Sequence, residues 1–254
     1  MRLVLIQPPL RAGDSEQNCK VIESLICSVR DSILPDDVIL LPEHFMSADD
    51  PKIYDSFMKH IAGRAGCVIV GGSHRRIFMD KRVNYGSVWD ARGSIIGEYT
   101  KLRPYFNESQ HVSPGQLLGE VTIHKKNILI LICADFWYSD IFFKTQKLPD
   151  VVLVPALSVS RKPSLEYSRS LWRNFAIQRS YEFGVYIGIS DWHADSILPE
   201  YRTCGVGGFA DPATADPKKL FTEIGEKNIS FFDLDFNALE HFRKDRRIRG
   251  FFWK

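Results

Sequence analysis

The sequence contains no long hydrophobic run. No stretch approaches the roughly 18 uninterrupted apolar residues that a membrane-spanning helix needs. The N-terminal segment MRLVLIQPPL has a short apolar run, but neither the longer hydrophobic core nor the small-residue cleavage site of a signal peptide. We therefore interpret it as a first strand and expect a cytoplasmic protein that does not bind membranes.

Cysteine motifs that bind metals are also missing. The chain has five cysteines, an odd number, with no Cys-x-x-Cys pair and no histidine at the spacing of a zinc site. This pattern argues against a structural metal and a disulfide framework, and we expect neither a metal nor a cofactor. The five are Cys19, Cys27, Cys67, Cys133 and Cys204.

The excess of charge of one sign is small. The chain has 33 Lys and Arg against 31 Asp and Glu, and this net charge of +2 gives no electrostatic reason to expect nucleic acid. The exception is HFRKDRRIRGFFWK, residues 241–254, which is basic with aromatic residues interspersed. Because exposed aromatic residues at a chain end are a liability in a monomer, we interpret this segment as an arm that packs on a partner subunit.

Linkers and low-complexity segments are absent as well. The chain has 254 residues, of which 44% are hydrophobic, and this is enough to form a large core. No Gly/Ser/Pro-rich stretch or charge block marks a boundary. We therefore expect a single domain over residues 1–254.

Strand-like apolar runs alternate with helical patterns along most of the chain, which is typical of an α/β layered fold. We expect helices near residues 15–32, 53–65 and 165–183, and a strand followed by a helix in ISFFDLDFNALEHFRKDRRIRG. VNYGSVWDARGSIIGEYTKL predicts two strands joined by a turn at Arg92 and Gly93. Further strands are expected in RLVLIQ, DVILLPE, CVIVGGSHRR, NILILIC, DVVLVPALS and VYIGISDW.

Three of these strands run into a residue that could do chemistry: Glu43 after DVILLP, Lys101 after GEYT and Cys133 after NILILI. Ligands of α/β sheets gather beyond strand ends. A thiol attacks only as the thiolate, and its ordinary pKa is about 8.5. Lys101 would supply a positive charge and Glu43 a base. Taken singly, each residue also has a structural explanation, as a core cysteine or as a surface Glu or Lys.

Several short motifs occur in the chain, and their order and spacing together are more specific than any single motif. Gln7 and a Gly-Asp pair occur in LVLIQPPLRAGDSEQN, Glu43 follows proline in LLPEHF, and Lys101 lies in EYTKLRPY. Glu108 precedes a Ser-Pro-Gly turn in FNESQHVSPGQ, Cys133 begins a Cys-x-Asp motif in LICADFWYSD, and SLWRNFAIQRSYEF follows. In these motifs the chain resembles the nitrilase superfamily, the carbon–nitrogen hydrolases, over nearly its whole length.

The resemblance implies a fold, a mechanism and a partner. The fold is a four-layer α-β-β-α sandwich, and the subunits pair into a homodimer or a higher homo-oligomer. Glu43 would take the proton of Cys133, the thiolate would attack the carbonyl of a small-molecule amide, and Lys101 with the N–H of Ala134 would stabilise the oxygen. Ammonia or an amine would leave, and water activated by Glu43 would hydrolyse the thioester. Glu108 would position the lysine or the substrate; the alternative is an exposed loop carboxylate.

The residues after the predicted nucleophile narrow the reaction. True nitrilases of the family usually continue with Trp-Glu, whereas Cys133-Ala134-Asp135 is similar to the amidase and carbamoylase branch. Asp135 is interpreted as a carboxylate that braces the turn. The Phe-Pro-Glu that usually follows is replaced by WYSD, residues 137–140. This departure indicates a divergent branch with an altered pocket.

Substrate-binding residues are expected in the loops that follow strands. Aromatic side chains there would line a partly apolar cleft, and Arg161 or Arg103 would bind a substrate carboxylate in a bidentate contact. Core packing explains Phe136 and Trp137 equally well. The candidates are Tyr105, Ala134, Phe136, Trp137 and Arg161.

Three other functions would use parts of the same site. The first alternative is a catalytically silent binding protein, and the second is an acyltransferase that uses the same thioester. The third is a Cys–His hydrolase with His44 or His193 as base. His44 directly follows Glu43, and adjacent residues at a strand end point apart, so we expect that these two do not serve one site. The sequence leaves open which amide or carbamoyl compound is the substrate.

Overall fold

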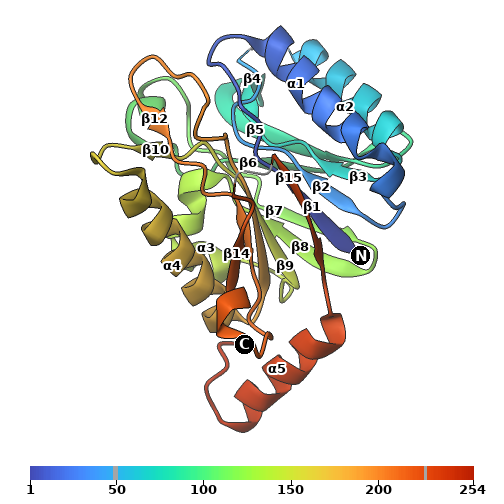
Figure 1. Ribbon diagram of the computed structural model, residues 1–254, viewed down its shortest axis with the longest axis vertical. Helices are drawn as coiled ribbons and strands as arrows, with labels where there is room; N and C mark the ends of the chain where they lie inside the picture. Colours follow the sequence, from blue (N-terminus) through green and yellow to red (C-terminus); the bar gives the residue numbers. More distant parts are fainter. Residues whose placement is uncertain (48–50, 226–227) are drawn as a thin grey trace.

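Two β-sheets packed against each other form the centre of the molecule (Figure 1). The computed structural model describes residues 1–47, 51–225 and 228–254. The first sheet has the order β15 (Ile229–Asp233), β1 (Arg2–Ile6), β2 (Val38–Leu40), β3 (Val68–Val70), β5 (Lys81–Trp89) and β4 (His74–Phe78), with β6 (Ile95–Thr100) paired to β5. The second has the order β14 (Phe221–Glu223), β13 (Gly208–Ala210), β11 (Tyr186–Ser190), β9 (Val151–Pro155), β8 (Lys126–Ile130) and β7 (Gly119–Ile123).

The central strands of each sheet run parallel. β1, β2 and β3 are parallel in the first sheet, and β8, β9 and β11 are parallel in the second. The carboxyl ends of parallel strands meet at one edge of a sheet, where α/β proteins bind their ligands. β10 (Val159–Ser160) and β12 (Arg202–Thr203) form a separate antiparallel pair.

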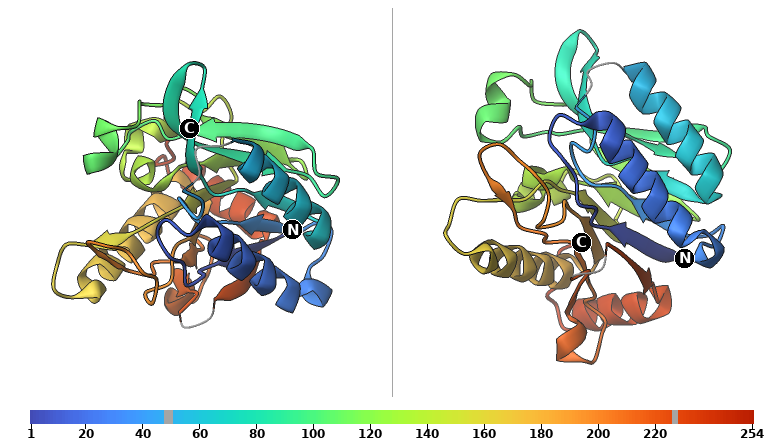
Figure 2. Two further views of the ribbon diagram at one scale, coloured as in Figure 1. Left: turned by 90° about the horizontal axis from the view of Figure 1, so that it is seen from above. Right: turned by 45° about the horizontal axis from the view of Figure 1, so that its top comes forward.

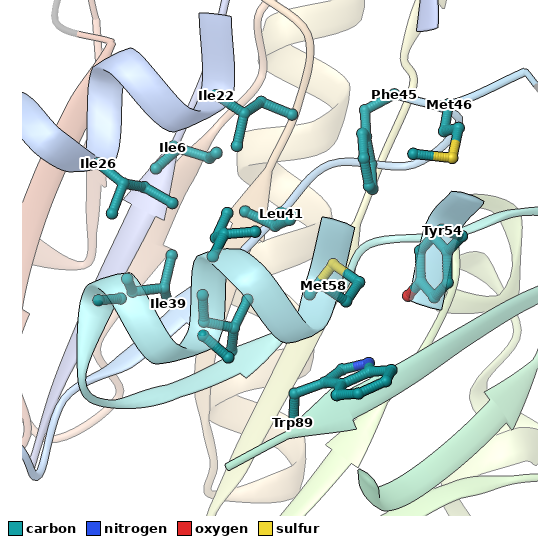
Figure 3. Close-up of a cluster of buried hydrophobic side chains, with 14 of the residues drawn as sticks. Ile6, Ile22, Ile26, Ile39, Leu41, Phe45, Met46, Tyr54, Met58 and Trp89 are labelled. Atoms are coloured by element: carbon teal, nitrogen blue, oxygen red, sulfur yellow. The ribbon is translucent and has the colours of Figure 1, made fainter. Parts of the chain in front are cut away.

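Helices α1 (Ser15–Ser28) and α2 (Pro51–Ala65) cover the outer face of the first sheet. The side chains of β1 alternate between its two faces: Val4 and Ile6 pack under these helices, and Leu3 and Leu5 face the second sheet. The side chains on both faces of β1 are fully buried, which explains why the strand has a continuous apolar sequence. Figure 3 shows the helix-facing cluster, including Ile22, Ile26, Ile39, Met58 and Trp89.

Two further apolar layers complete the molecule. Between the sheets, Leu5 and Leu40 of the first belong to one cluster with Ile128 and Leu153 of the second. On the far face of the second sheet, α3 (Ser139–Phe142) and α4 (Leu165–Phe183) cover the remaining side chains. Figure 2 shows α1 and α2 on one side of the sheets and the yellow helix α4 on the other. The predicted four-layer α-β-β-α sandwich is confirmed.

Most of the expected elements are present. The helix predicted over residues 165–183 is α4 with the same bounds, and it ends where Gly184 adopts a left-handed conformation with φ of 61°. The predicted turn between β5 and β6 contains Gly93, also left-handed with φ of 75°. No strand is predicted for β7, β13 or β14: β7 and β14 are irregularly buried, and β13 has only three residues. Among the described residues, no helix combines the length and the apolar character needed to cross a membrane.

The C-terminal arm packs on its own chain. In α5 (Phe236–Ile248), Arg243 forms an ion pair of 2.9 Å with Asp150 and donates to the backbone oxygen of Gly184. Beyond the helix, the indole N–H of Trp253 donates to the oxygen of Phe183 at 2.8 Å. The aromatic end of the chain is therefore partly covered without a partner subunit. Contact with a second copy stays a prediction.

Candidate active site

Glu43 lies just past β2 and is held by several parts of the chain. Its N–H donates to the oxygen of Ala156 at 3.2 Å, and its own oxygen accepts the indole N–H of Trp192 at 2.6 Å. One carboxylate oxygen accepts the ammonium of Lys101 at 2.7 Å, and the other accepts the N–H of Leu157 at 3.1 Å. The side chain is only 2% exposed. These contacts give the carboxylate one orientation.

Cys133 begins the 3₁₀ turn η3 (Cys133–Trp137) soon after β8 ends. Its φ of 45° lies in the left-handed region, which is uncommon for a residue with a side chain. The Sγ atom contacts the oxygen of Leu157 at 3.9 Å. Burial, and then the charge of Glu43, raise the pKa of the Cys133 thiol well above its ordinary value, against the opposing charge of Lys101. The resting group is therefore a thiol that needs a base to become a nucleophile.

Lys101 follows β6 directly and joins two carboxylates. Its Nζ donates to Glu43 and to Glu108, at 2.7 Å each, and the residue is 2% exposed. Burial alone would lower the pKa of this lysine, but the charges of Glu43, Cys133 and Glu108 outweigh burial and raise the pKa above its ordinary value. Lys101 is therefore a fixed positive charge next to the thiol.

Glu108 lies in the 3₁₀ turn η2 (Phe106–Gln110) and is half-buried, so it is not the exposed loop carboxylate considered as an alternative. It accepts hydrogen bonds from Lys101, from Asn84 at 2.8 Å and from the N–H of Tyr105 at 3.1 Å. Burial works to raise the pKa of Glu108, but the hydrogen bond with His44 and the charge of Lys101 prevail and lower it below its ordinary range. Glu108 is ionised beside the lysine.

The structure adds two residues that the sequence analysis did not assign to the site. The Nδ2 atom of Asn84, in β5, lies 2.9 Å from Glu43 and 2.8 Å from Glu108, so it joins the same two carboxylates as Lys101. The Nε2 atom of His44 lies 3.3 Å from Glu108 and 3.7 Å from Glu43. Asn84 belongs to none of the short motifs, and a polar Asn inside an apolar strand was its only sequence signal, whereas His44 lies in LLPEHF and was considered only as the base of a Cys–His hydrolase.

The expectation that His44 and Glu43 point to different places is wrong. Adjacent side chains point apart only within a strand, but β2 ends at Leu40, and His44 has a left-handed φ of 53°. This turn brings the imidazole back beside the carboxylate of Glu43. His193 lies elsewhere and forms its ion pair with Asp195 at 3.4 Å.

Asp135 connects the turn of the nucleophile to the loop of the lysine. Its carboxylate accepts the N–H groups of Leu102 and Arg103, at 2.9 and 2.8 Å. Burial raises its pKa to about 6, and the two backbone hydrogen bonds oppose this rise. The predicted bracing role therefore fits the contacts, although the braced segment is the one after Lys101.

One set of three side chains has the spacing of a cation site. Single ligand atoms of Glu43, His44 and Glu108 lie within 4.8 Å of one another. The ammonium of Lys101 already binds both carboxylates of this set. The chain itself thus supplies the positive charge between them.

A cavity of about 520 Å³ opens over Cys133. Four of the five predicted substrate-binding residues line it: Tyr105, Ala134, Trp137 and Arg161. Phe136 does not, because its ring is fully buried and stacks on Trp172 in the core, 6.1 Å between centroids. The placement of Phe136 in the pocket was wrong, and the alternative of core packing holds. A further wall of the cavity, not predicted from the sequence, is formed by Tyr167, Ser168, Leu171 and Trp172 of α4.

The two arginines proposed for a carboxylate contact have different surroundings. Arg103 donates to Asp140 at 2.6 Å and lies over the ring of Tyr138, so it already has a carboxylate partner. The guanidinium of Arg161 lies 3.7 Å from the centre of the Phe106 ring, at the cavity. Among the described residues, no carboxylate forms an ion pair with Arg161. Of these two arginines, Arg161 is the one available to an anionic ligand.

Comparison with known proteins gives one family. The model of the carbon–nitrogen hydrolase family matches residues 2–194. This range contains the two carboxylates, the lysine and the thiol described above. A search of curated proteins found no significant match.

Solved structures of similar fold cover almost the whole chain. Nit3 from Saccharomyces cerevisiae, a member of branch 10 of the nitrilase superfamily, is 20% identical, with a TM-score of 0.81 over 96% of this chain and 93% of that one. A carbon–nitrogen hydrolase from Helicobacter pylori G27 is 16% identical, with a TM-score of 0.80 over 98% and 94%. An amidase from Nesterenkonia sp. is 17% identical, with a TM-score of 0.75 over 98% and 95%. At these identities the likeness establishes the shared fold.

Proposed function

The chain belongs to the carbon–nitrogen hydrolase family, and from this premise we propose that it hydrolyses amide or N-carbamoyl bonds through a thioester on Cys133. The observation that carries the proposal is the backbone of Leu157. Its N–H donates to the carboxylate of Glu43, and its oxygen contacts the thiol of Cys133. One residue, which lines the cavity together with Cys133, thus contacts both the base and the nucleophile.

In the first half of the reaction, Glu43 takes the proton from the thiol of Cys133. The thiolate attacks the amide carbon, and the developing negative oxygen is stabilised by the ammonium of Lys101 and the N–H of Ala134. The carbon–nitrogen bond breaks, and the nitrogen takes the proton from Glu43 and leaves as ammonia or an amine. The acyl group stays on Cys133 as a thioester.

In the second half, water replaces the leaving group. Glu43 takes one proton from the water, the oxygen attacks the thioester carbon, and the carbon–sulfur bond breaks. Glu43 returns this proton to the departing thiolate, so the products are a carboxylic acid and the free thiol. Lys101 and Glu108 keep their charges throughout, since Glu108 lies beside the lysine and compensates its charge.

The amidase relative supports a reactive cysteine at this place in the fold. A variant of the amidase from Nesterenkonia sp. AN1 in which Glu is replaced by Gln carries acrylamide, added at the active-site cysteine. A soft electrophile thus reaches the thiol of that protein. We infer that Cys133 has the same accessibility, because it lines the cavity.

For the substrate, we propose an amide whose acyl part is apolar and ends in a carboxylate. The cavity has aromatic walls from Trp137, Tyr167 and Trp172, and Arg161 at its rim is held by the ring of Phe106. An Arg161→Ala variant should raise KM for an acidic amide by about 10-fold to 100-fold, the loss of a charged hydrogen bond. A neutral amide of the same length is the control. An unchanged KM for the acidic amide would exclude the carboxylate contact.

The test of the reaction is ammonia release from small amides, ω-amides and N-carbamoyl amino acids. Wild type should release ammonia and Cys133→Ala should not. Cys67→Ala is the matched control, because that thiol is buried in the cluster under α1 and α2 and does not line the cavity. Added hydroxylamine reports acyl transfer, since it would trap the thioester as a hydroxamate. Silence of wild type on all compounds would favour the catalytically silent binding protein.

A further inference from the structure

We propose that Asp191 and Trp192, the two residues after β11, are positioning residues that hold the base Glu43 from two sides. The inference rests on the proposed function, because it concerns the same base. Trp192 would hold the backbone of Glu43, and Asp191 would hold Ser158, the neighbour of Leu157, whose N–H donates to the Glu43 carboxylate. Neither residue lines the cavity, so both act through Glu43 and not on the substrate.

Trp192 binds the backbone of Glu43 directly. Its indole N–H donates to the Glu43 oxygen at 2.6 Å, across 149 residues of sequence. The ring is 1% exposed and belongs to the apolar cluster under α1 and α2, together with Phe45. His44, the next residue, has its left-handed φ of 53°. The hydrogen bond therefore fixes the chain immediately before an unfavourable turn, where a small rotation would move the Glu43 side chain.

Asp191 acts on the other end of Glu43 through two neighbouring residues. Its carboxylate accepts the N–H of Ser158 at 2.8 Å and the Ser158 hydroxyl, and it also accepts the N–H of Val206 at 2.9 Å. The N–H of Ser158 and the oxygen of Leu157 belong to one peptide, and this oxygen contacts the Cys133 thiol. The N–H of Leu157, in the preceding peptide, donates to the Glu43 carboxylate. Asp191 thus anchors the residue next to Leu157, which contacts both the base and the nucleophile.

The chemistry of Asp191 favours this role over a general contribution to stability. The side chain is fully buried, and the partners found for it in the described part of the chain are N–H and O–H groups, not a cation. Burial raises its pKa to about 6, so ionisation in the fold has a cost. A buried apolar residue would stabilise the same place better. The carboxylate instead binds three donors from two loops and so holds these loops at one point.

The first variant is Trp192→Phe, which keeps an aromatic ring and removes the indole N–H. Trp89→Phe is the matched control. Trp89 lies in the same cluster, seen in Figure 3, is 5% exposed, and donates its indole N–H to Ser87 at 2.7 Å, away from Glu43. Both variants lose one buried indole hydrogen bond. If thermal unfolding shows that the two variants lose similar stability, their activities can be compared directly.

Two readouts separate positioning from stability. For an amide that wild type hydrolyses, Trp192→Phe should lower kcat by about 10-fold to 100-fold with little change of KM, because the base is displaced and the cavity is not. The second readout is the pH midpoint of alkylation of Cys133 by iodoacetamide, followed by mass spectrometry of that peptide. The charge of Glu43 raises the pKa of this thiol and Lys101 lowers it, so a displaced Glu43 should lower the midpoint. Trp89→Phe should change neither.

A second pair of variants covers the case in which Trp192→Phe does not fold. Asp191→Asn removes the charge and one acceptor with little change of shape, and it should lower both kcat and the alkylation midpoint. Asp37→Asn is its control, because Asp37 is also a buried carboxylate, held by Arg2 and by the N–H of Leu34. If the variants at 191 and 192 match their controls in both readouts, the inference is overturned.

The two proposals can fail separately. If wild type hydrolyses no amide but the alkylation midpoint falls in both variants, the proposed function fails and the positioning role stands. If wild type hydrolyses amides and neither readout changes, the positioning role fails and the proposed function stands.

Discussion

Glu43 and Glu108 bind the same ammonium group from two different parts of the molecule. Glu43 lies just past a buried parallel strand and is bound to Ala156, Leu157 and Trp192, which directly follow strands β9 and β11 of the second sheet. Glu108 lies in a turn of a surface loop, and its contacts come from its own loop and the first sheet. One carboxylate is fixed by both sheets and the other by one. The difference suggests that Glu43 moves protons and Glu108 sets the place and charge of Lys101.

The sharpest test of this comparison is Glu43→Gln. The amide keeps the shape but cannot accept a proton, so amide hydrolysis should fall by about 1000-fold or more. Cys133 should still react with iodoacetamide, because the thiol keeps Lys101 as its neighbour. Glu120→Gln, a carboxylate outside the cavity that accepts the N–H of Gln146, is the control. Activity within tenfold of wild type would mean that another group is the base.

Glu108→Gln should have a smaller effect. Its amide can still accept from Asn84 or from the N–H of Tyr105, but it no longer compensates the charge of Lys101. We expect kcat/KM to fall by about 10-fold to 100-fold, the range of one charged hydrogen bond. The measurement is the steady-state rate beside that of Glu43→Gln. Equal losses in the two variants would remove the distinction between base and positioning group.

A still smaller effect is expected for His44→Asn. Asn tolerates the left-handed backbone of this position, so the variant removes the contact of the imidazole with Glu108 without straining the turn. Activity should fall by less than about tenfold, because the variant loses one hydrogen bond. A loss as large as that of Glu43→Gln would instead support the Cys–His hydrolase. The pH profile of kcat/KM then shows whether an imidazole is titrating.

The smallest effect on activity is expected at Asp135, which joins the loop of Lys101 to the turn of Cys133. Its pKa of about 6 in the fold lies above the unfolded value of about 3.9. Between these pH values the folded protein binds more protons than the unfolded chain. The contribution of Asp135 to the free energy of unfolding therefore falls by about 3 kcal/mol as pH rises from about 4 to 6. Asp135→Asn has no such dependence. Urea unfolding of both proteins at several pH values should show wild type losing stability relative to the variant across this window.

Local patterns were enough for much of the fold. The apolar runs at β1, β2, β8, β9 and β11 and the period of α4 predict elements that the structure contains. These strands are buried on both faces, so their sequences are continuous and easy to identify. β13 and β14 have three residues each. β2 is equally short but lies in the longer apolar run DVILLPE, whereas β13 and β14 lie in no such run and depend on pairing partners, which a local pattern does not contain.

The sequence by itself determined the chemical groups: a thiol, a lysine and two carboxylates in motifs whose order indicated the family and the four-layer fold. The tertiary structure decided how these groups are held. Asn84 and His44 joined the carboxylates, Phe136 went to the core, and Trp192 reached Glu43 across 149 residues. The physical reason is that a motif records the neighbours of a residue along the chain. The position of a catalytic atom depends on left-handed turns and on hydrogen bonds between strands of two different sheets, which only the folded chain brings together.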